Sequence, residues 1–128
     1  MKVIDSTFIT DLINSVEQTQ KVISQKDILL TTQINMYEVM RGIFYRGHSC
    51  NKIFAVQELF ENMRVLPMNE DSIIKSAEIF AALRKKGQII SDCDCLTAGI
   101  ALSHGIKTII TRNIKDFKRI KGINLESY

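Results

Sequence analysis

Two acidic side chains, Asp92 and Asp94, precede an almost wholly apolar run in this 128-residue chain. A short β-rich run at residues 107–111 follows, and a third carboxylate, Asp116, lies just beyond the polar residues 111–113. An apolar run of this kind is usually buried, so charged residues at both of its ends need an explanation. Parallel α/β sheets place their chemistry at strand ends and helix starts. Carboxylates gathered there are suited to hold a hard divalent cation.

Two more acidic residues are expected to lie at the same edge of the sheet. Asp5 directly follows an apolar run at the start of the chain, and Glu38 lies about two turns into a predicted helix. Asp5 can equally serve only as the cap of the helix that follows it. Glu38 can equally pair with Arg41 on the surface, a contact worth about 0.2–0.5 kcal/mol. Both alternatives stay open at this point.

The elements that must position these residues are short apolar runs alternating with amphipathic segments. Strands are predicted at residues 2–5, 27–31, 64–66 and 107–111. Helices are predicted from about residue 7, over 32–46, 51–63 and 69–86, and from about residue 94. This alternation indicates an α/β domain around a mainly parallel sheet. The chain has neither repeats nor linkers, so we expect a single domain over residues 1–128.

Two of the predicted helices carry apolar stripes that helical spacing assigns to the core. The stripe of the helix over residues 32–46 consists of Ile34, Tyr37, Met40 and Phe44. The residues expected inside on the helix over residues 69–86 are Ile73, Ile74, Ala77, Phe80 and Ala81.

In this topology Asp5, Glu38, Asp94 and Asp116 gather at the carboxyl edge of the sheet. Four carboxylates in one place repel one another, and without a cation at least one of them should have a raised pKa. A bound Mg²⁺ or Mn²⁺ removes the conflict, because hard cations take oxygen ligands and keep several waters. The sequence therefore predicts a metal site at this edge.

Composition and charge bound the alternatives. The apolar fraction of 45% and charged fraction of 24% are ordinary for a globular protein, and no apolar run approaches the ~18 residues of a membrane span. The three cysteines form no CxxC pair, which predicts reduced thiols in the cytoplasm. The net charge is only +3, but six basic residues and one acidic residue lie between Lys107 and Lys121.

The chain resembles the PIN-domain ribonucleases, in particular the short VapC-type toxins of toxin–antitoxin pairs. The resemblance covers essentially the whole chain. It rests on residues 3–7 (VIDST), on Glu38 followed by Gly42, and on Gly87 leading to Asp94. Its most specific part is the segment TRNIKDF at residues 111–117, with Asp94 and Asp116 separated by 22 positions.

The resemblance implies a three-layer α/β/α domain with about four to five strands and a metal-dependent endoribonuclease activity. Asp5, Glu38, Asp94 and Asp116 match the acidic quartet of the family, which implies an Mg²⁺ or Mn²⁺ cofactor. It also implies a homodimer, held inactive by a small antitoxin protein whose tail enters the acidic groove. Two departures are visible: the first motif reads Asp-Ser-Thr, and Cys-Leu-Thr-Ala-Gly follows Asp94. Both keep small or similar side chains.

The polar residues around Asp116 are candidates for substrate contacts. Thr111, Arg112 and Asn113 are placed to hold the scissile phosphate, although Asn113 can equally cap the short helix that carries Asp116. A basic group would attract the RNA backbone, or can equally be a solvated surface. This group consists of Lys107, Arg112, Lys115, Lys118, Arg119 and Lys121.

Three rival interpretations are weaker. Asp92-Cys93-Asp94 mimics the DxD motif of dehalogenase-type phosphatases, but that motif belongs on a first strand, and only 34 residues follow Asp94. A receiver domain needs a phosphoacceptor Asp near the third strand, where residues 64–67 contain none. A non-catalytic interaction module would leave four clustered carboxylates without a use, at a cost in stability.

Asp92 and Asp94 are expected to differ, because side chains two positions apart diverge by about 200° on a helix. Asp94, at the start of a packed helix, is the predicted ligand, and Asp92 with Ser91 is the predicted cap. Asp11 and Asp71 are expected to lie outside the site, so Asp11→Asn and Asp71→Asn should change RNA cleavage little.

Overall fold

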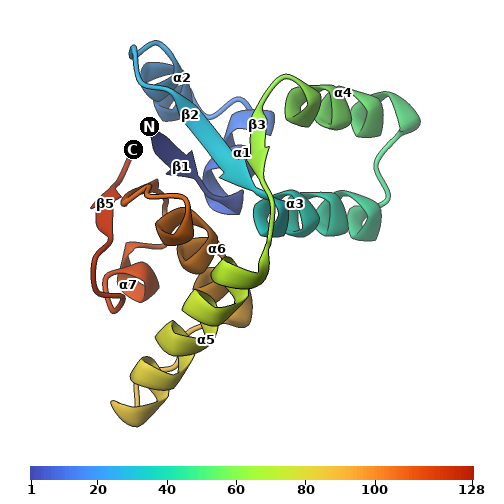
Figure 1. Ribbon diagram of the computed structural model, residues 1–128. Helices are drawn as coiled ribbons and strands as arrows, with labels where there is room; N and C mark the ends of the chain where they lie inside the picture. Colours follow the sequence, from blue (N-terminus) through green and yellow to red (C-terminus); the bar gives the residue numbers. More distant parts are fainter.

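The computed structural model describes residues 1–128 as five strands and seven helices (Figure 1). The strands are β1 (Lys2–Ile4), β2 (Leu29–Thr32), β3 (Arg64–Leu66), β4 (Thr108–Ile110) and β5 (Asn124–Glu126). The helices are α1 (Ser6–Ile13), α2 (Glu17–Ile23), α3 (Gln33–Arg46), α4 (Cys50–Glu61), α5 (Glu70–Lys85), α6 (Asp92–Ser103) and α7 (Ile114–Phe117). None of the helices combines the length and apolar character that crossing a membrane requires.

The five strands form one sheet in the order β3-β2-β1-β4-β5, and every neighbouring pair is parallel. The chain builds from β1 to β2 and β3 on one side, and α5 and α6 then carry it back to β4 on the other side of β1 (Figure 1). The direction of winding therefore reverses between β1 and β4. In open parallel sheets the crevice at such a reversal, beyond the carboxyl ends of the strands, is the usual ligand site.

Successive residues of the central strands point to opposite faces of the sheet. Val3 and Ile109 belong to a core cluster that includes residues of α5, α6 and α7. Ile4 and Ile110 belong to a second cluster built with α1, α3 and α4. Helices thus cover both faces, which confirms the predicted three-layer α/β/α fold with a parallel sheet of four to five strands.

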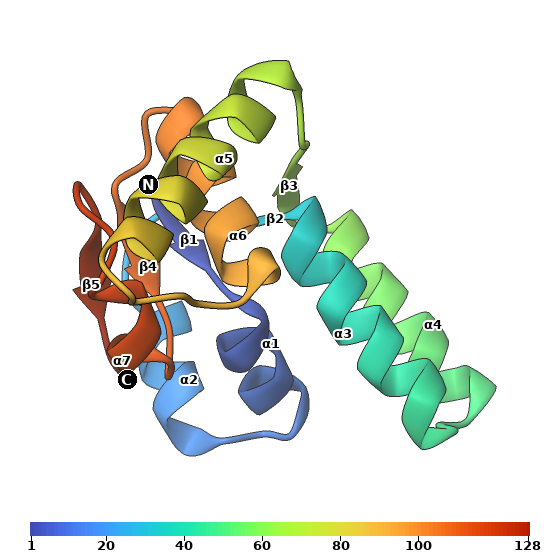
Figure 2. The ribbon, with the colours of Figure 1, turned by 90° about the horizontal axis from the view of Figure 1, so that it is seen from below.

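Helices α5 and α6 pack closely because small side chains face each other across the contact. A Cβ atom added at Gly99 of α6 would lie 2.8 Å from the backbone nitrogen of Ser76 in α5 and closer still to its hydroxyl oxygen. The Ser76 hydroxyl itself donates to the Ser72 carbonyl within α5. This close approach holds α6, which carries Asp94, against α5. Figure 2 shows the other helix pair, α3 and α4, extending away from the body of the protein.

Two elements were not predicted from the sequence, α2 and the edge strand β5. The predicted core faces of two helices were only partly correct. Ile34 and Met40 of α3 and Phe80 of α5 do pack against the core. In α3, Tyr37 and Phe44 are exposed, and the buried residues are instead Asn35, Val39 and Ile43. In α5, Ile73 and Ile74 are exposed, and the residues that face the core are Ser72, Ser76, Ile79 and Leu83.

Candidate active site

Asp5 follows the end of β1 and lies almost fully buried at the carboxyl edge of the sheet. Its Oδ1 accepts hydrogen bonds from the Phe8 backbone N–H at 3.1 Å and from the Thr7 hydroxyl at 2.6 Å. Its Oδ2 accepts from the Thr111 hydroxyl at 2.5 Å. Asp5 therefore caps α1, which was one of the two roles predicted for it. It is also hydrogen-bonded to Thr111, directly after β4. Burial raises its pKa, although these hydrogen bonds oppose the rise.

Glu38 projects from α3 toward the start of α1. Its Oε1 accepts from the Ser6 hydroxyl at 3.2 Å. Burial raises the pKa of Glu38, and the neighbouring Asp5 carboxylate acts in the same direction. The surface ion pair with Arg41 is not formed; the Arg41 guanidinium lies instead over the Tyr37 ring, 5.1 Å from its centroid.

Asp94 stands in the first turn of α6, the helix that Gly99 and Ser76 hold against α5. The cap of α6 is Ser91, whose hydroxyl accepts from the Asp94 backbone N–H at 3.2 Å. The predicted capping role of Asp92 is thus filled by Ser91 alone, and Asp92 is exposed. Burial raises the pKa of Asp94 to about 6, and the carboxylates of Glu38, Asp5 and Asp116 push it in the same direction. The other three predicted carboxylates therefore all lie within electrostatic reach of Asp94.

Asn113 joins the last two of these carboxylates. Its side-chain nitrogen donates to Asp94 Oδ2 at 3.0 Å and to Asp116 Oδ2 at 3.3 Å. Asn113 occupies the cap position of α7, but its side chain makes no capping hydrogen bond. Its alternative role as a helix cap is therefore wrong. As a donor between two acceptors, Asn113 brings Asp94 and Asp116 to a common point.

Thr111 is fully buried, and its hydroxyl is already engaged. It donates to Asp5 and accepts from the Asn113 backbone N–H at 2.9 Å. The Thr7 hydroxyl accepts from the Arg112 backbone N–H at 3.0 Å. These contacts indicate that Thr111 orients Asp5 and the loop after β4. From the sequence Thr7 was at most a helix-cap candidate, although a hydroxyl two residues after an Asp is a recognisable turn signal.

Arg112 is anchored by a residue that was expected to lie outside the site. Its Nη1 donates to Asp11 Oδ1 at 3.1 Å. Asp11 is only 7% exposed, and its second oxygen accepts from the Tyr128 hydroxyl at 2.6 Å. Asp11, whose neutralisation was expected to matter little, therefore holds a predicted substrate contact in place. Lys115, the remaining predicted contact, is exposed.

The carboxylates do not form a closed cage of protein ligands around a metal position. No three His, Cys, Asp or Glu side chains stand close enough to hold an ion by protein ligands alone. Mg²⁺ is usually bound by one or two carboxylates and keeps several of its waters. The four oxygen donors, three of which have a raised pKa because of burial, fit a hydrated divalent ion of this kind.

Residues 2–123 match the family model described as PIN domain. The chain is 32% identical to the tRNA(fMet)-specific endonuclease VapC of Salmonella typhimurium, over 76% of this chain and 73% of that protein. It is 31% identical to Ribonuclease VapC1 of Methanocaldococcus jannaschii, over 66% and 62% of the two chains.

Solved structures agree with this relationship. VapBC-1 from nontypeable Haemophilus influenzae superimposes with a TM-score of 0.84 at 25% identity, over 98% of this chain and 96% of that one. The fold of VapBC2 from Rickettsia felis, bound to a DNA fragment from the promoter, matches with a TM-score of 0.87 at 20% identity, over 99% and 98% of the chains. The chain belongs to the PIN-domain family, among the VapC-type ribonucleases, as the resemblance implied.

Proposed function

We propose that this protein is a divalent-metal-dependent endoribonuclease that acts in the cytoplasm as the toxin of a type II toxin–antitoxin pair. The observation that carries the proposal is the convergence of four carboxylates at the reversal point of the sheet, where Asp94 has a pKa of about 6 because it is buried among the other three. Perturbed acidic groups in such a crevice are typical of sites that perform chemistry. The named activities of the VapC relatives support the same reaction class.

The four carboxylates would have different roles, which follow from their positions. Asp5 and Asp94 would hold an Mg²⁺ or Mn²⁺ ion, directly or through water, because both lie at fixed ends of packed elements. Glu38 and Asp116 would complete the site or orient the attacking water. When bound, the ion supplies an activated water and neutralises charge on the phosphate oxygens. Asn113 holds the Asp94 and Asp116 carboxylates next to each other through its two hydrogen bonds.

Substrate contacts fall mainly to Arg112 and Lys115. The Arg112 side chain is 64% exposed even though Asp11 anchors one of its nitrogens, so the rest of its guanidinium is free to meet an RNA phosphate. Lys115 extends from α7, one residue before Asp116, and is exposed. Thr111 and Asn113, which also belong to the predicted set, contribute by positioning these groups and the carboxylates.

The test is cleavage of a panel of structured RNAs by the purified protein with Mg²⁺, Mn²⁺ or EDTA. Asp5→Asn, Glu38→Gln and Asp116→Asn are each expected to reduce the rate by at least ~100-fold, since each removes a charge from the metal site. Asp71→Asn is the matched control, because Asp71 is an exposed residue of α5. Equal rates in all four variants, or full activity in EDTA, would refute the proposal and leave a non-catalytic module or another acidic-site phosphohydrolase.

Exposed apolar side chains support the proposed protein partners, an antitoxin and a second copy of this chain. Tyr37 and Phe44 of α3 are 57% and 60% exposed, and Ile73 and Ile74 of α5 are 49% and 53% exposed. Large apolar side chains grouped on helix faces often mark protein interfaces. We expect light scattering to report a dimer of the purified chain. Phe44→Glu or Ile74→Glu is expected to yield monomers, and a dimer unaffected by both would place the interface elsewhere.

A further inference from the structure

A cavity of about 600 Å³ lies outside the acidic site, between the second half of α5 and residues 119–121. None of the four carboxylates lines it. Its apolar wall includes Ile79 and Leu83 of α5 and Ile120, which are all nearly buried, together with Ala81 and Ala82. Its volume is within the range of about 300–1,000 Å³ that is typical of small-molecule sites. The space is therefore large enough for one nucleotide.

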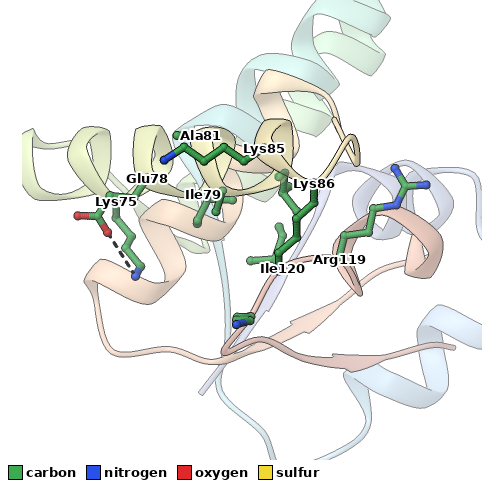
Figure 3. A pocket seen from close by; sticks show the side chains of 11 residues that line it. Lys75, Glu78, Ile79, Ala81, Lys85, Lys86, Arg119 and Ile120 are labelled. Carbon is green, nitrogen blue, oxygen red and sulfur yellow. Dashed lines mark ion pairs between the residues drawn. The ribbon is translucent and has the colours of Figure 1, made fainter.

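The polar lining of this cavity is strongly basic. One acidic residue, Glu78, is paired with Lys75 at 3.7 Å. The other cations that line the cavity form no ion pair with any carboxylate: Lys85, Lys86, Arg119 and Lys121. Figure 3 shows Lys86 reaching from the end of α5 toward Ile120, with Arg119 beside it. The cations come from two segments far apart in the sequence.

Helix polarity accounts for only part of this arrangement. Cations in the last turn of α5 stabilise the negative end of the helix dipole by about 0.3–1 kcal/mol each. Arg119 and Lys121 are not part of α5, and they add like charges to the same space. Like charges gathered around a cavity repel one another, so the arrangement favours an anion in the cavity.

Two backbone segments connect this cavity to the acidic site. The Arg119 backbone N–H donates to the Asp116 carbonyl at 3.1 Å, so Arg119 lies one turn beyond a proposed metal ligand. The Arg119 guanidinium donates to the Ile89 carbonyl at 3.3 Å, in the segment that leads to α6 and Asp94. The cavity is therefore connected, through Arg119, to the backbone segments that carry Asp116 and lead to Asp94.

We propose that this cavity, the α5–119 pocket, binds a nucleotide of the RNA substrate next to the cleavage site. The phosphates contact Lys85, Lys86, Arg119 and Lys121, and the sugar and base cover the aliphatic wall. Single-stranded nucleic acids are commonly bound by such a combination of basic groove and apolar platform. The inference rests on the proposed ribonuclease function. It assigns to this pocket a second contact with the RNA, outside the acidic site.

The test compares two triple variants with equal charge. The pocket variant is Lys85→Ala, Lys86→Ala and Lys121→Ala, which leaves the structural hydrogen bond of Arg119 intact. The control variant is Lys21→Ala, Lys26→Ala and Arg64→Ala, three exposed cations outside the pocket. Binding of a short labelled single-stranded RNA is measured in EDTA over a range of salt concentrations. Melting temperatures verify that both variants fold.

The slope of log affinity against log salt concentration is expected to be smaller in magnitude by about 2 in the pocket variant. The variant removes three cations, and each phosphate contact with a single strand contributes about 0.7 to the slope. The control should keep the wild-type slope. With Mg²⁺ present, the pocket variant should raise KM and leave kcat unchanged, because binding remote from the chemistry is lost. Equal slopes and KM values in the two variants would overturn the pocket proposal.

The remaining outcomes separate this proposal from the one it rests on. A wild-type protein that cleaves RNA, with an inactive Asp94→Asn variant and an unaffected pocket variant, refutes the pocket and keeps the ribonuclease. A wild-type protein that neither binds nor cleaves RNA overturns both. A pocket variant that binds RNA normally but no longer self-associates would assign these cations to an interface between protein chains.

Discussion

Asp94→Asn should stabilise the metal-free protein at neutral pH, although it removes a proposed metal ligand. The pKa of Asp94 is about 6, compared with an ordinary value of 3.8, because the side chain is buried near three other carboxylates. A carboxyl group with a raised pKa binds its proton more tightly in the folded state. The folded protein therefore loses stability as pH rises from about 4 to about 6. Asparagine carries no charge and avoids that loss.

The size of the effect follows from the same values. The difference between 3.8 and about 6 corresponds to about 3 kcal/mol at about 1.36 kcal/mol for each pKa unit. Because the Asp94 side chain is only half-buried, solvent screening reduces this to about 1–2 kcal/mol. Asp94 also lies in the first turn of α6, where a negative charge is favoured by about 0.3–1 kcal/mol. A suitable control must remove that contribution.

Asp92→Asn provides the control, because Asp92 is an exposed carboxylate in the same first turn. Thermal unfolding of both variants is measured without metal between pH 4 and pH 8. At pH 7 Asp94→Asn should be more stable than Asp92→Asn by about 1–2 kcal/mol. Each kcal/mol corresponds to about 4 °C in melting temperature for a domain of this size. The difference should disappear near pH 4. Added Mg²⁺ should then stabilise the wild type and the Asp92 variant more than the Asp94 variant, since it binds only folded protein.

Two results would refute this reasoning. If Asp94→Asn melts below Asp92→Asn at pH 7, the four carboxylates do not repel one another as their positions indicate. If the difference between the variants is the same at every pH, it arises from packing or hydrogen bonding at Asn113 rather than from charge. An equal response of both variants to Mg²⁺ would remove Asp94 from the metal site.

Two further substitutions examine the groups that position the site. Asp11→Asn should lower the free energy of unfolding by about 1–2 kcal/mol, since it weakens hydrogen bonds to a charged group. It should also slow RNA cleavage as much as Arg112→Ala does. If the rate losses of the two substitutions add up in the double variant, the two residues act independently and the proposed contact has no role in cleavage. Gly99→Ala should lower the stability measured by urea unfolding by about 1–3 kcal/mol, because its Cβ would meet the Ser76 backbone at 2.8 Å. Gly42→Ala, which meets only the flexible end of a side chain, should be neutral or stabilising; similar losses at both glycines would contradict the close packing of α5 and α6.

The acidic residues could be found from the sequence because their positions follow from chain topology. Asp5 ends a buried strand, and Asp94 begins a buried helix. Thr111 ends the strand that pairs with β1 on the side opposite β2. Parallel pairing brings these ends to one edge whatever the details of packing. Residue type and parallel topology were therefore sufficient to bring Asp5 and Asp94 to one edge, whereas Glu38, inside α3, had no such signal.

The orientation of the helices could not be found in the same way. In α5 the most apolar residues, such as Ile73 and Ile74, are exposed, while Ser72 and Ser76 are buried. Small side chains are needed there because Gly99 brings α6 into close contact. In α3 the buried Asn35 donates to the Thr97 hydroxyl at 3.2 Å. A stripe of apolar residues identifies the core only when the helix has a single apolar face.

The short elements that escaped prediction carry weak local signals. Helix α2 has seven residues, of which only Thr19 is fully buried. Strand β5 has three residues at the edge of the sheet and none that is fully buried. Its contribution comes from pairing with β4, and its last residue, Glu126, accepts a hydrogen bond from the Thr111 backbone N–H at 3.0 Å. Tertiary pairing of this kind leaves no periodic pattern in the sequence.

The polar residues that position the site were also hard to predict, for a different reason. Thr7, Asp11 and Asn113 act through partners 101 to 105 positions away, or across two elements, as in the contact between Asn113 and Asp94. Thr7 and Asn113 are residue types common at turns and helix starts, and Asp11 lies within α1, so none of the three signals a distant partner in the sequence. Only the pairing of β1 with β4 shows that the hydroxyl, amide and carboxylate groups meet at the same edge. Strand topology therefore accounts for where the proposed metal ligands lie, whereas their orientation depends on side chains whose contacts are visible only in three dimensions.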